Sequence, residues 1–185
     1  AFLVGDNADN SVELLVDNGN VVIRGLDNTT INGAAADFVI TAGASSMGSL
    51  TAFLGNGNDR FVIDAVAVNG NVAISGGAGA DEIGVIGNAS LNGHATLSGN
   101  AGTDRFSLQD STFAGTVRIN GGDNADTIAL STATLGSRLL VSGGKGNDDI
   151  VVDNSTIAGN THIVGQRGHD DIVIRDSTLS RNLLI

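Results

Sequence analysis

The sequence contains no cysteine, no proline, no tryptophan and no tyrosine. Because cysteine is absent, neither a disulfide framework nor a thiolate metal site is available to the chain. Aromatic residues make up only 3%, so the core must be aliphatic, and the aromatic platforms on which sugars stack are scarce. No apolar run reaches about 18 residues, and we therefore expect no membrane insertion.

Basic residues are also few. Nine Lys and Arg stand against 20 Asp and Glu, for a net charge of −11. This balance disfavours phosphate backbones and anionic lipid, so we expect no nucleic-acid partner, and it favours hard cations. Hydrophobic residues, at 41%, exclude a disordered chain, and 27 glycines without proline or a three-residue period indicate tight turns rather than collagen.

One short pattern recurs along the chain and is clearest at 143–151, where glycines precede Asp148 and Ile150 follows two places later. The equivalent aspartates are separated by steps of 22 or 23 residues. A fixed period of this size is typical of a solenoid in which each repeat is one coil. The recurring aspartates are Asp37, Asp59, Asp81, Asp104, Asp126, Asp148 and Asp170.

Apolar positions follow each aspartate in three sets, and residues two apart share one face of a strand. In the Asp148 coil these sets begin at Ile150, Ile157 and Thr161. We therefore predict an all-β fold, a parallel β-helix (β-solenoid) of about 22 residues per coil with three short strands in each. Right-handedness is the default for parallel connections. The extra residue of the Asp81 coil falls in a loop at Gly87-Asn88.

The first 30 residues fit the pattern poorly. Asn18-Gly19 separates two β-branched runs, which predicts a type I′ hairpin, although one irregular coil with its corner at this turn is the alternative. We predict a single domain, with residues 1–30 as an irregular first coil or capping hairpin and residues 31–185 as regular coils. Because the chain ends at Ile185 inside an expected strand, we expect further coils of the same array, or another copy end-on, to follow it.

Polar residues form columns on the outside of the predicted coils. Arg60, Glu82 and Arg105 alternate in sign on neighbouring coils, which predicts cross-strand ion pairs. Asp149 and Asp171 are like charges in neighbouring coils, either solvated or offset by a cation or by a nearby Lys145 or Arg167. A further column belongs to a corner, where such side chains support turns. Its members are Asn88, Asp110, Thr132, Asn154 and Asp176.

Two of the glycine-rich turns, 76–84 and 143–151, fit the pattern G-G-x-G-x-D-x-U-x. Here the sequence resembles the RTX (haemolysin-type) calcium-binding nonapeptide, over about nine residues of each coil. Other copies depart from the pattern at Leu54, Asn100, Asn124 and Gln166, and the copy at 32–37 lacks two of three glycines. The length of the coil is instead similar to that of the parallel β-helices of pectate lyases, tailspikes and surface adhesins.

The RTX resemblance implies a structural Ca²⁺ held between coils by turn carbonyls and by aspartate carboxylates, since Ca²⁺ takes six to eight hard oxygen ligands. The alternative interpretation is that glycine supplies the turn and each aspartate accepts hydrogen bonds from neighbouring backbone N–H groups. The predicted metal ligands are Asp59, Asp81, Asp104, Asp126, Asp148 and Asp170.

No catalytic constellation is indicated, because His94, His162 and His169 lie at different points of the repeat. We therefore predict no catalytic residues and no organic cofactor. The predicted function is a non-enzymatic structural or adhesive rod or stalk of a secreted or cell-surface bacterial protein, stabilised by calcium. The alternative is a carbohydrate-binding or polysaccharide-degrading β-helix, with a cell-surface or matrix glycan as its partner.

Overall fold

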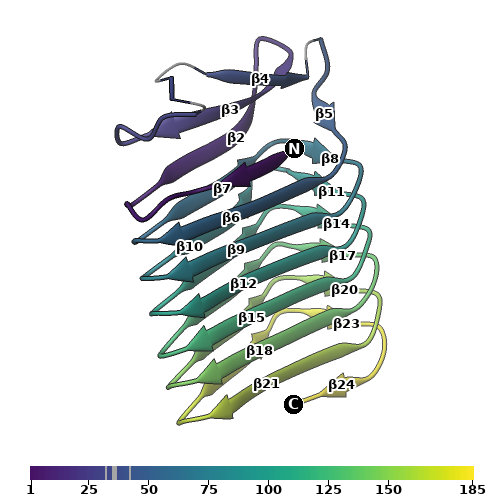
Figure 1. Ribbon diagram of the computed structural model, residues 1–185. Helices are drawn as coiled ribbons and strands as arrows, with labels where there is room; N and C mark the ends of the chain where they lie inside the picture. Colours follow the sequence, from purple (N-terminus) through teal and green to yellow (C-terminus); the bar gives the residue numbers. More distant parts are fainter. Residues whose placement is uncertain (32, 35–36, 42) are drawn as a thin grey trace.

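The computed structural model describes residues 1–31, 33–34, 37–41 and 43–185, which form a β-solenoid of stacked coils (Figure 1). The coils carry their strands in three sheets, as the periodicity predicted. Across the described residues, there is no helix of the length and apolar character needed to cross a bilayer.

Sheet A holds the longest strands, most of seven residues, and all of its pairings are parallel. Its strands, in spatial order, are β1 (Phe2–Val4), β6 (Leu50–Asn56), β9 (Val72–Ala78), β12 (Ala95–Ala101), β15 (Val117–Asp123), β18 (Leu139–Lys145), β21 (Thr161–Arg167) and β24 (Leu183–Leu184).

Sheet B follows the aspartate turns and packs against sheet A. Its strands, in spatial order, are β22 (Asp171–Arg175), β19 (Asp149–Asp153), β16 (Thr127–Ser131), β13 (Arg105–Gln109), β10 (Glu82–Ile86), β7 (Arg60–Asp64), β2 (Ser11–Asp17), β3 (Asn20–Leu26) and β4 (Phe38–Thr41).

Sheet C consists of two-residue strands and closes each coil between sheets B and A, where the sequence predicted a short strand. Its strands, in spatial order, are β23 (Thr178–Leu179), β20 (Thr156–Ile157), β17 (Thr134–Leu135), β14 (Thr112–Phe113), β11 (Ser90–Leu91), β8 (Ala67–Val68) and β5 (Ser46–Met47).

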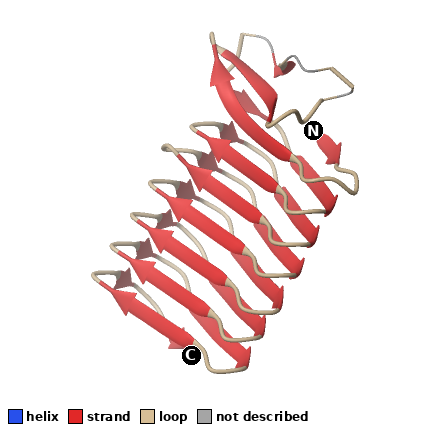
Figure 2. Cartoon of the chain, turned by 90° about the vertical axis from the view of Figure 1, so that its left-hand side faces the viewer, coloured by secondary structure: helices blue, strands red, loops and turns tan. Residues whose placement is uncertain are grey.

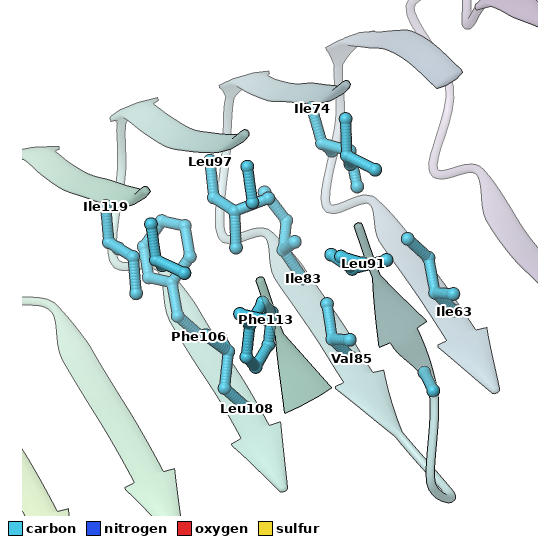
Figure 3. Packing of buried hydrophobic residues seen from close by; sticks show 14 of the residues in the cluster. Ile63, Ile74, Ile83, Val85, Leu91, Leu97, Phe106, Leu108, Phe113 and Ile119 are labelled. Atoms are coloured by element: carbon cyan, nitrogen blue, oxygen red, sulfur yellow. The ribbon is translucent and has the colours of Figure 1, made fainter. Parts of the chain in front are cut away.

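The core is one continuous column of aliphatic side chains with a few phenylalanines (Figure 3). In sheet A, alternate residues point inward, so that Ile74, Leu97 and Ile119 stack on successive coils. Phe106 from sheet B and Phe113 from sheet C are at most 1% exposed and fill the space between the sheets. Each coil thus buries its apolar face against its neighbours, which is why one coil is not a stable unit alone.

The hairpin predicted at Asn18-Gly19 is present: β2 and β3 pair antiparallel, and both turn residues have positive φ, 49° and 74°. Strand β4 then pairs antiparallel with β3. This antiparallel excursion lies across the N-terminal end of sheet B (Figure 2). Its apolar side chains, including Val21 and Ile23, join the core and cover that end.

The expected start of the regular coils at residue 31 is wrong in detail. Strand β1 and the first half of β2 already pair in parallel with β6 and β7, and the excursion interrupts this first coil. Regular coils resume only at Ser46, where β5 joins sheet C. The 22-residue step from Asp37 to Asp59 is therefore coincidental, because Asp37 precedes an antiparallel strand. Asn32, Ala35 and Ala36 of the predicted 32–37 turn lie outside the described residues.

The corner between sheets B and C is held by residues in left-handed conformation, which confirms the predicted column. In successive coils these are Ala65, Asn88, Asp110, Thr132, Asn154 and Asp176, with φ between 45° and 66°. Asn and Asp tolerate this region, whereas a β-branched residue such as Thr132 is strained there. The extra residue of the Asp81 coil, at Gly87 with φ 69°, is absorbed at the same corner.

Candidate metal site: the buried aspartate file

The six predicted ligands line up one per coil, at the turn from sheet A into sheet B, and we call this column the aspartate file. Asp59, Asp81, Asp104, Asp126 and Asp148 are 1–2% exposed, and Asp170 is half-buried. Asp37 does not belong to it. That residue is exposed and binds the guanidinium of Arg24, with Nε–Oδ1 and Nη2–Oδ2 distances of 2.9 and 2.6 Å.

The place that the periodicity gave to Asp37 is taken by Asn10. Its backbone N–H donates to Asp59 Oδ1 at 2.7 Å, and its side-chain Nδ2 donates to the same oxygen at 3.0 Å. Val12 and Leu14 follow Asn10 by two and four places, as in every later coil. That spacing was the signal for Asn10, but the inserted hairpin hid it by lengthening the step to Asp59.

Every file carboxylate makes the same hydrogen bond. Its Oδ1 accepts the backbone N–H of the equivalent residue one coil earlier; Asp126 Oδ1, for example, accepts from Asp104 N at 2.7 Å. The corresponding distances to Asp81, Asp104, Asp148 and Asp170 Oδ1 are 2.8, 2.8, 2.8 and 3.0 Å. The bonding described by the alternative interpretation, aspartate to neighbouring backbone, is therefore present. Each turn N–H is satisfied across coils, which locks the register.

The second oxygen of each carboxyl has no such partner. Oδ2 of Asp59, Asp81, Asp104, Asp126 and Asp148 is buried, and none of these oxygens makes a hydrogen bond. In four of these coils Oδ2 lies against the first glycine of the turn, where a Cβ would come within 2.0–2.2 Å of it. These glycines, Gly76, Gly99, Gly121 and Gly143, have no left-handed φ. They are required by the volume of the carboxyl group rather than by backbone conformation.

The other two glycine positions of the turn have a different cause. The second has positive φ in every coil, including those with Asn100 and Gln166, both at 80°. A Cβ at Gly144 would also come 2.1 Å from the carbonyl oxygen of Gly122 on the preceding coil. The third is likewise left-handed, and Asn124 adopts φ 74° there. The departures from the nonapeptide pattern thus keep the backbone conformation that the pattern encodes.

Burial in this environment favours the neutral carboxylic acid. Desolvation raises the pKa of Asp81 to about 6 and that of Asp126 to about 7, although the hydrogen bonds from Asp59 N and Asp104 N oppose the shift. The pKa values of Asp59, Asp104 and Asp148 are raised for the same reason. Neighbouring carboxyls add repulsion, because successive coils lie about 4.8 Å apart. The file therefore requires protons or a cation to offset its charge.

The side chains of the file do not by themselves make a calcium cage. Within the described ranges, no three Asp, Glu, His or Cys side chains converge on one point. One orphaned Oδ2 per coil is an available hard oxygen, but Ca²⁺ takes six to eight. The remaining ligands would have to come from main-chain carbonyls of the glycine turns.

The outer columns follow the sequence predictions in part. Arg60 and Glu82 form the predicted ion pair, at 3.4 Å between Nε and Oε2. Arg105 stands beside Glu82 in register, but the described coordinates place no ion pair between them. Lys145 does not offset Asp149, because its Nζ binds Asp123 Oδ1 at 2.8 Å.

Comparison of the chain with protein-family models, with curated proteins and with solved structures gave no significant match. The function is therefore argued from the geometry alone.

Proposed function

We propose that this chain is a non-enzymatic rod, a stalk or scaffold segment of a secreted or cell-surface protein. The observation that carries the proposal is the unbroken register of its coils. From β7 to β23, each strand pairs in parallel with the strand one coil later in all three sheets. The aspartate file and the core column repeat without interruption over the same coils. Such a lattice is built to hold length and stiffness.

A rod of equivalent coils tolerates the loss of one whole coil but not of a fraction. We therefore propose to remove residues 105–126, which joins Asp104 to Thr127 in the register that BP-paired neighbours already share. The shortened chain should keep its β spectrum and be about 4.8 Å shorter by small-angle scattering. The matched control removes residues 105–115 and should not fold, because half a coil displaces the core positions. If both deletions behave alike, coil equivalence is refuted.

The absence of catalysis is tested separately. Incubation with a panel of neutral and acidic polysaccharides should release no new reducing ends or unsaturated products above a heat-denatured control. Turnover would replace the rod with the alternative, a polysaccharide-degrading β-helix, and residue-by-residue substitution of the exposed acidic side chains would then locate the site.

Calcium is the second part of the proposal: we propose that Ca²⁺ stabilises the aspartate file. Its support is the row of buried, unpartnered Oδ2 atoms beside glycine turns. Millimolar Ca²⁺ should raise the thermal midpoint at pH 8, and EGTA should reverse the change. Mg²⁺ at the same concentration is the control, because it demands octahedral geometry and keeps its waters. An unchanged midpoint in Ca²⁺ would leave protons as the group that neutralises the file.

A further inference from the structure

The outer face of sheet A has a charge opposite to that of the protein as a whole. Residues 94–101, 116–123, 138–145 and 160–167 hold four of the nine Lys and Arg and one of the 20 Asp and Glu. The four cations are Arg118, Arg138, Lys145 and Arg167, all exposed. The single acid, Asp123, is already paired with Lys145. We call the exposed surface of β12, β15, β18 and β21 the basic face; it faces the viewer in Figure 1.

The basic face is hollowed along the axis of the rod. A groove of about 520 Å³ is lined by Arg118, Asn120, Ser142, His162 and Gln166. A second hollow of about 460 Å³ shares His162 with it and adds Arg138. A third of about 340 Å³ shares Arg118 and adds His94. The three are continuous through their shared residues and cross the strands of successive coils.

Strand register explains how the groove acquires its chemistry. Arg118, Leu140 and His162 are direct neighbours on successive strands, so they form one row about 4.8 Å apart. Asn120 and Ser142 form the next row. The groove therefore alternates guanidinium and imidazole groups with amides and hydroxyls. None of the three arginines Arg118, Arg138 and Arg167 has a carboxylate within ion-pair distance among the described residues.

We propose that the basic face binds an anionic polysaccharide, a chain of sugars that carries carboxylate or sulfate groups, lying along the groove. Guanidinium groups bind carboxylate and sulfate through paired N–H donors, and the amide and hydroxyl rows match sugar hydroxyls. This proposal goes beyond the rod and does not depend on it.

Two other anionic partners fit the face less well. Single-stranded nucleic acid is bound through aromatic stacking, and no aromatic side chain lies on β12, β15, β18 or β21. A net charge of −11 also repels a densely charged phosphate chain at long range. A second copy of this chain would have to present its own acidic residues, such as Asp149 and Asp171 on sheet B, in matching register.

The experiment measures binding of the intact chain by calorimetry in 50 mM salt to three probes: a polyuronate, a sulfated dextran and neutral dextran. We expect binding to one or both anionic probes, none to neutral dextran, and loss of affinity as salt is raised. The two anionic arms distinguish carboxylate from sulfate recognition. Arg118→Gln and Arg138→Gln should each weaken binding roughly twofold to fivefold.

The matched control is Arg105→Gln, which removes an exposed arginine without an ion pair from the opposite sheet, B. Its affinity should equal that of the unmodified chain. Equal losses for Arg105→Gln and Arg118→Gln would overturn the assignment to this face. So would absence of binding to both anionic probes, tighter binding to an oligo-dT than to either polysaccharide, or self-association that Arg118→Gln abolishes. A thermal melt of each variant separates loss of binding from loss of fold.

Discussion

Replacing Asp126 by Asn tests the electrostatics of the aspartate file most directly. Asparagine keeps an Oδ1 that accepts the N–H of Asp104 and removes the ionisable group. The pKa of Asp126 rises from 3.8 to about 7 in the folded state because the carboxyl is buried. Three pKa units at 1.36 kcal/mol each correspond to about 4 kcal/mol of destabilisation once the group is ionised. This figure is an upper bound, since adjacent carboxyls readjust.

The sign of the effect follows from linkage. A carboxyl with a raised folded pKa binds its proton more tightly in the folded state, so its stability contribution is complete below pH 3.8 and is lost as the pH rises through about 7. The unmodified protein should therefore be more stable at pH 4.5 than at pH 8, in the absence of calcium. Asp126→Asn should raise the free energy of unfolding at pH 8 by several kcal/mol, up to about 4, and change it little at pH 4.5.

The assay is urea unfolding followed by circular dichroism at both pH values in EGTA. The companion variant Asp126→Ala removes the acceptor as well, leaves Asp104 N–H buried without a partner, and should cost about 1–3 kcal/mol at pH 4.5. If Asp126→Asn is no more stable than the unmodified chain at pH 8, the file is not strained by its charge. If the same variant instead abolishes a stabilising effect of Ca²⁺, the carboxylates are metal ligands.

Three further substitutions test the packing. Gly121→Ala should lower the free energy of unfolding by about 3 kcal/mol, because its Cβ would lie 2.2 Å from Asp126 Oδ2; Gly136→Ala, with no atom nearer than 3.5 Å, should change it by less than about 0.5 kcal/mol, and similar losses for both would contradict the role given to the glycine. Thr132→Asn should stabilise by about 0.5–1 kcal/mol in urea unfolding, since Asn154 adopts the same left-handed corner, and a loss would show that the hydroxyl contacts outweigh strain. Phe106→Ala should cost about 3–5 kcal/mol in the same assay, and a cost below 1 kcal/mol would mean that the core collapses around the gap.

Most of the regular coils could be predicted from the sequence, because each position repeats the same demand. Ile150 and Val152 point inward wherever the strand places them, and the step of 22 residues carries this requirement to the next coil. The step also misled at Asp37, where an antiparallel hairpin happens to match the period. Only the pairing of β2 with β7 shows that Asn10 holds that place.

The candidate site was predictable in position but not in chemistry. The sequence placed Asp81 and Asp126 in one file, but it could not show that Oδ1 is committed to a backbone N–H while Oδ2 remains buried without a partner. The function of Gly121 was hidden for the same reason. A glycine that makes space for a side chain five residues later reads, in sequence, like any turn glycine. The basic face was missed because Arg118 and His162 lie 44 positions apart in the sequence and meet on one surface only when the coils stack.

The direction of the hydrogen bonds in the file has a consequence for how the chain folds as it is synthesised. Each aspartate N–H receives its acceptor from the carboxylate that is translated about 22 residues later. A newly emerged coil therefore exposes an unsatisfied donor at its leading edge, and the arrival of the next coil removes that penalty. Ordering proceeds like a ratchet from the first coil toward the last, and each step protects the preceding turn from reopening.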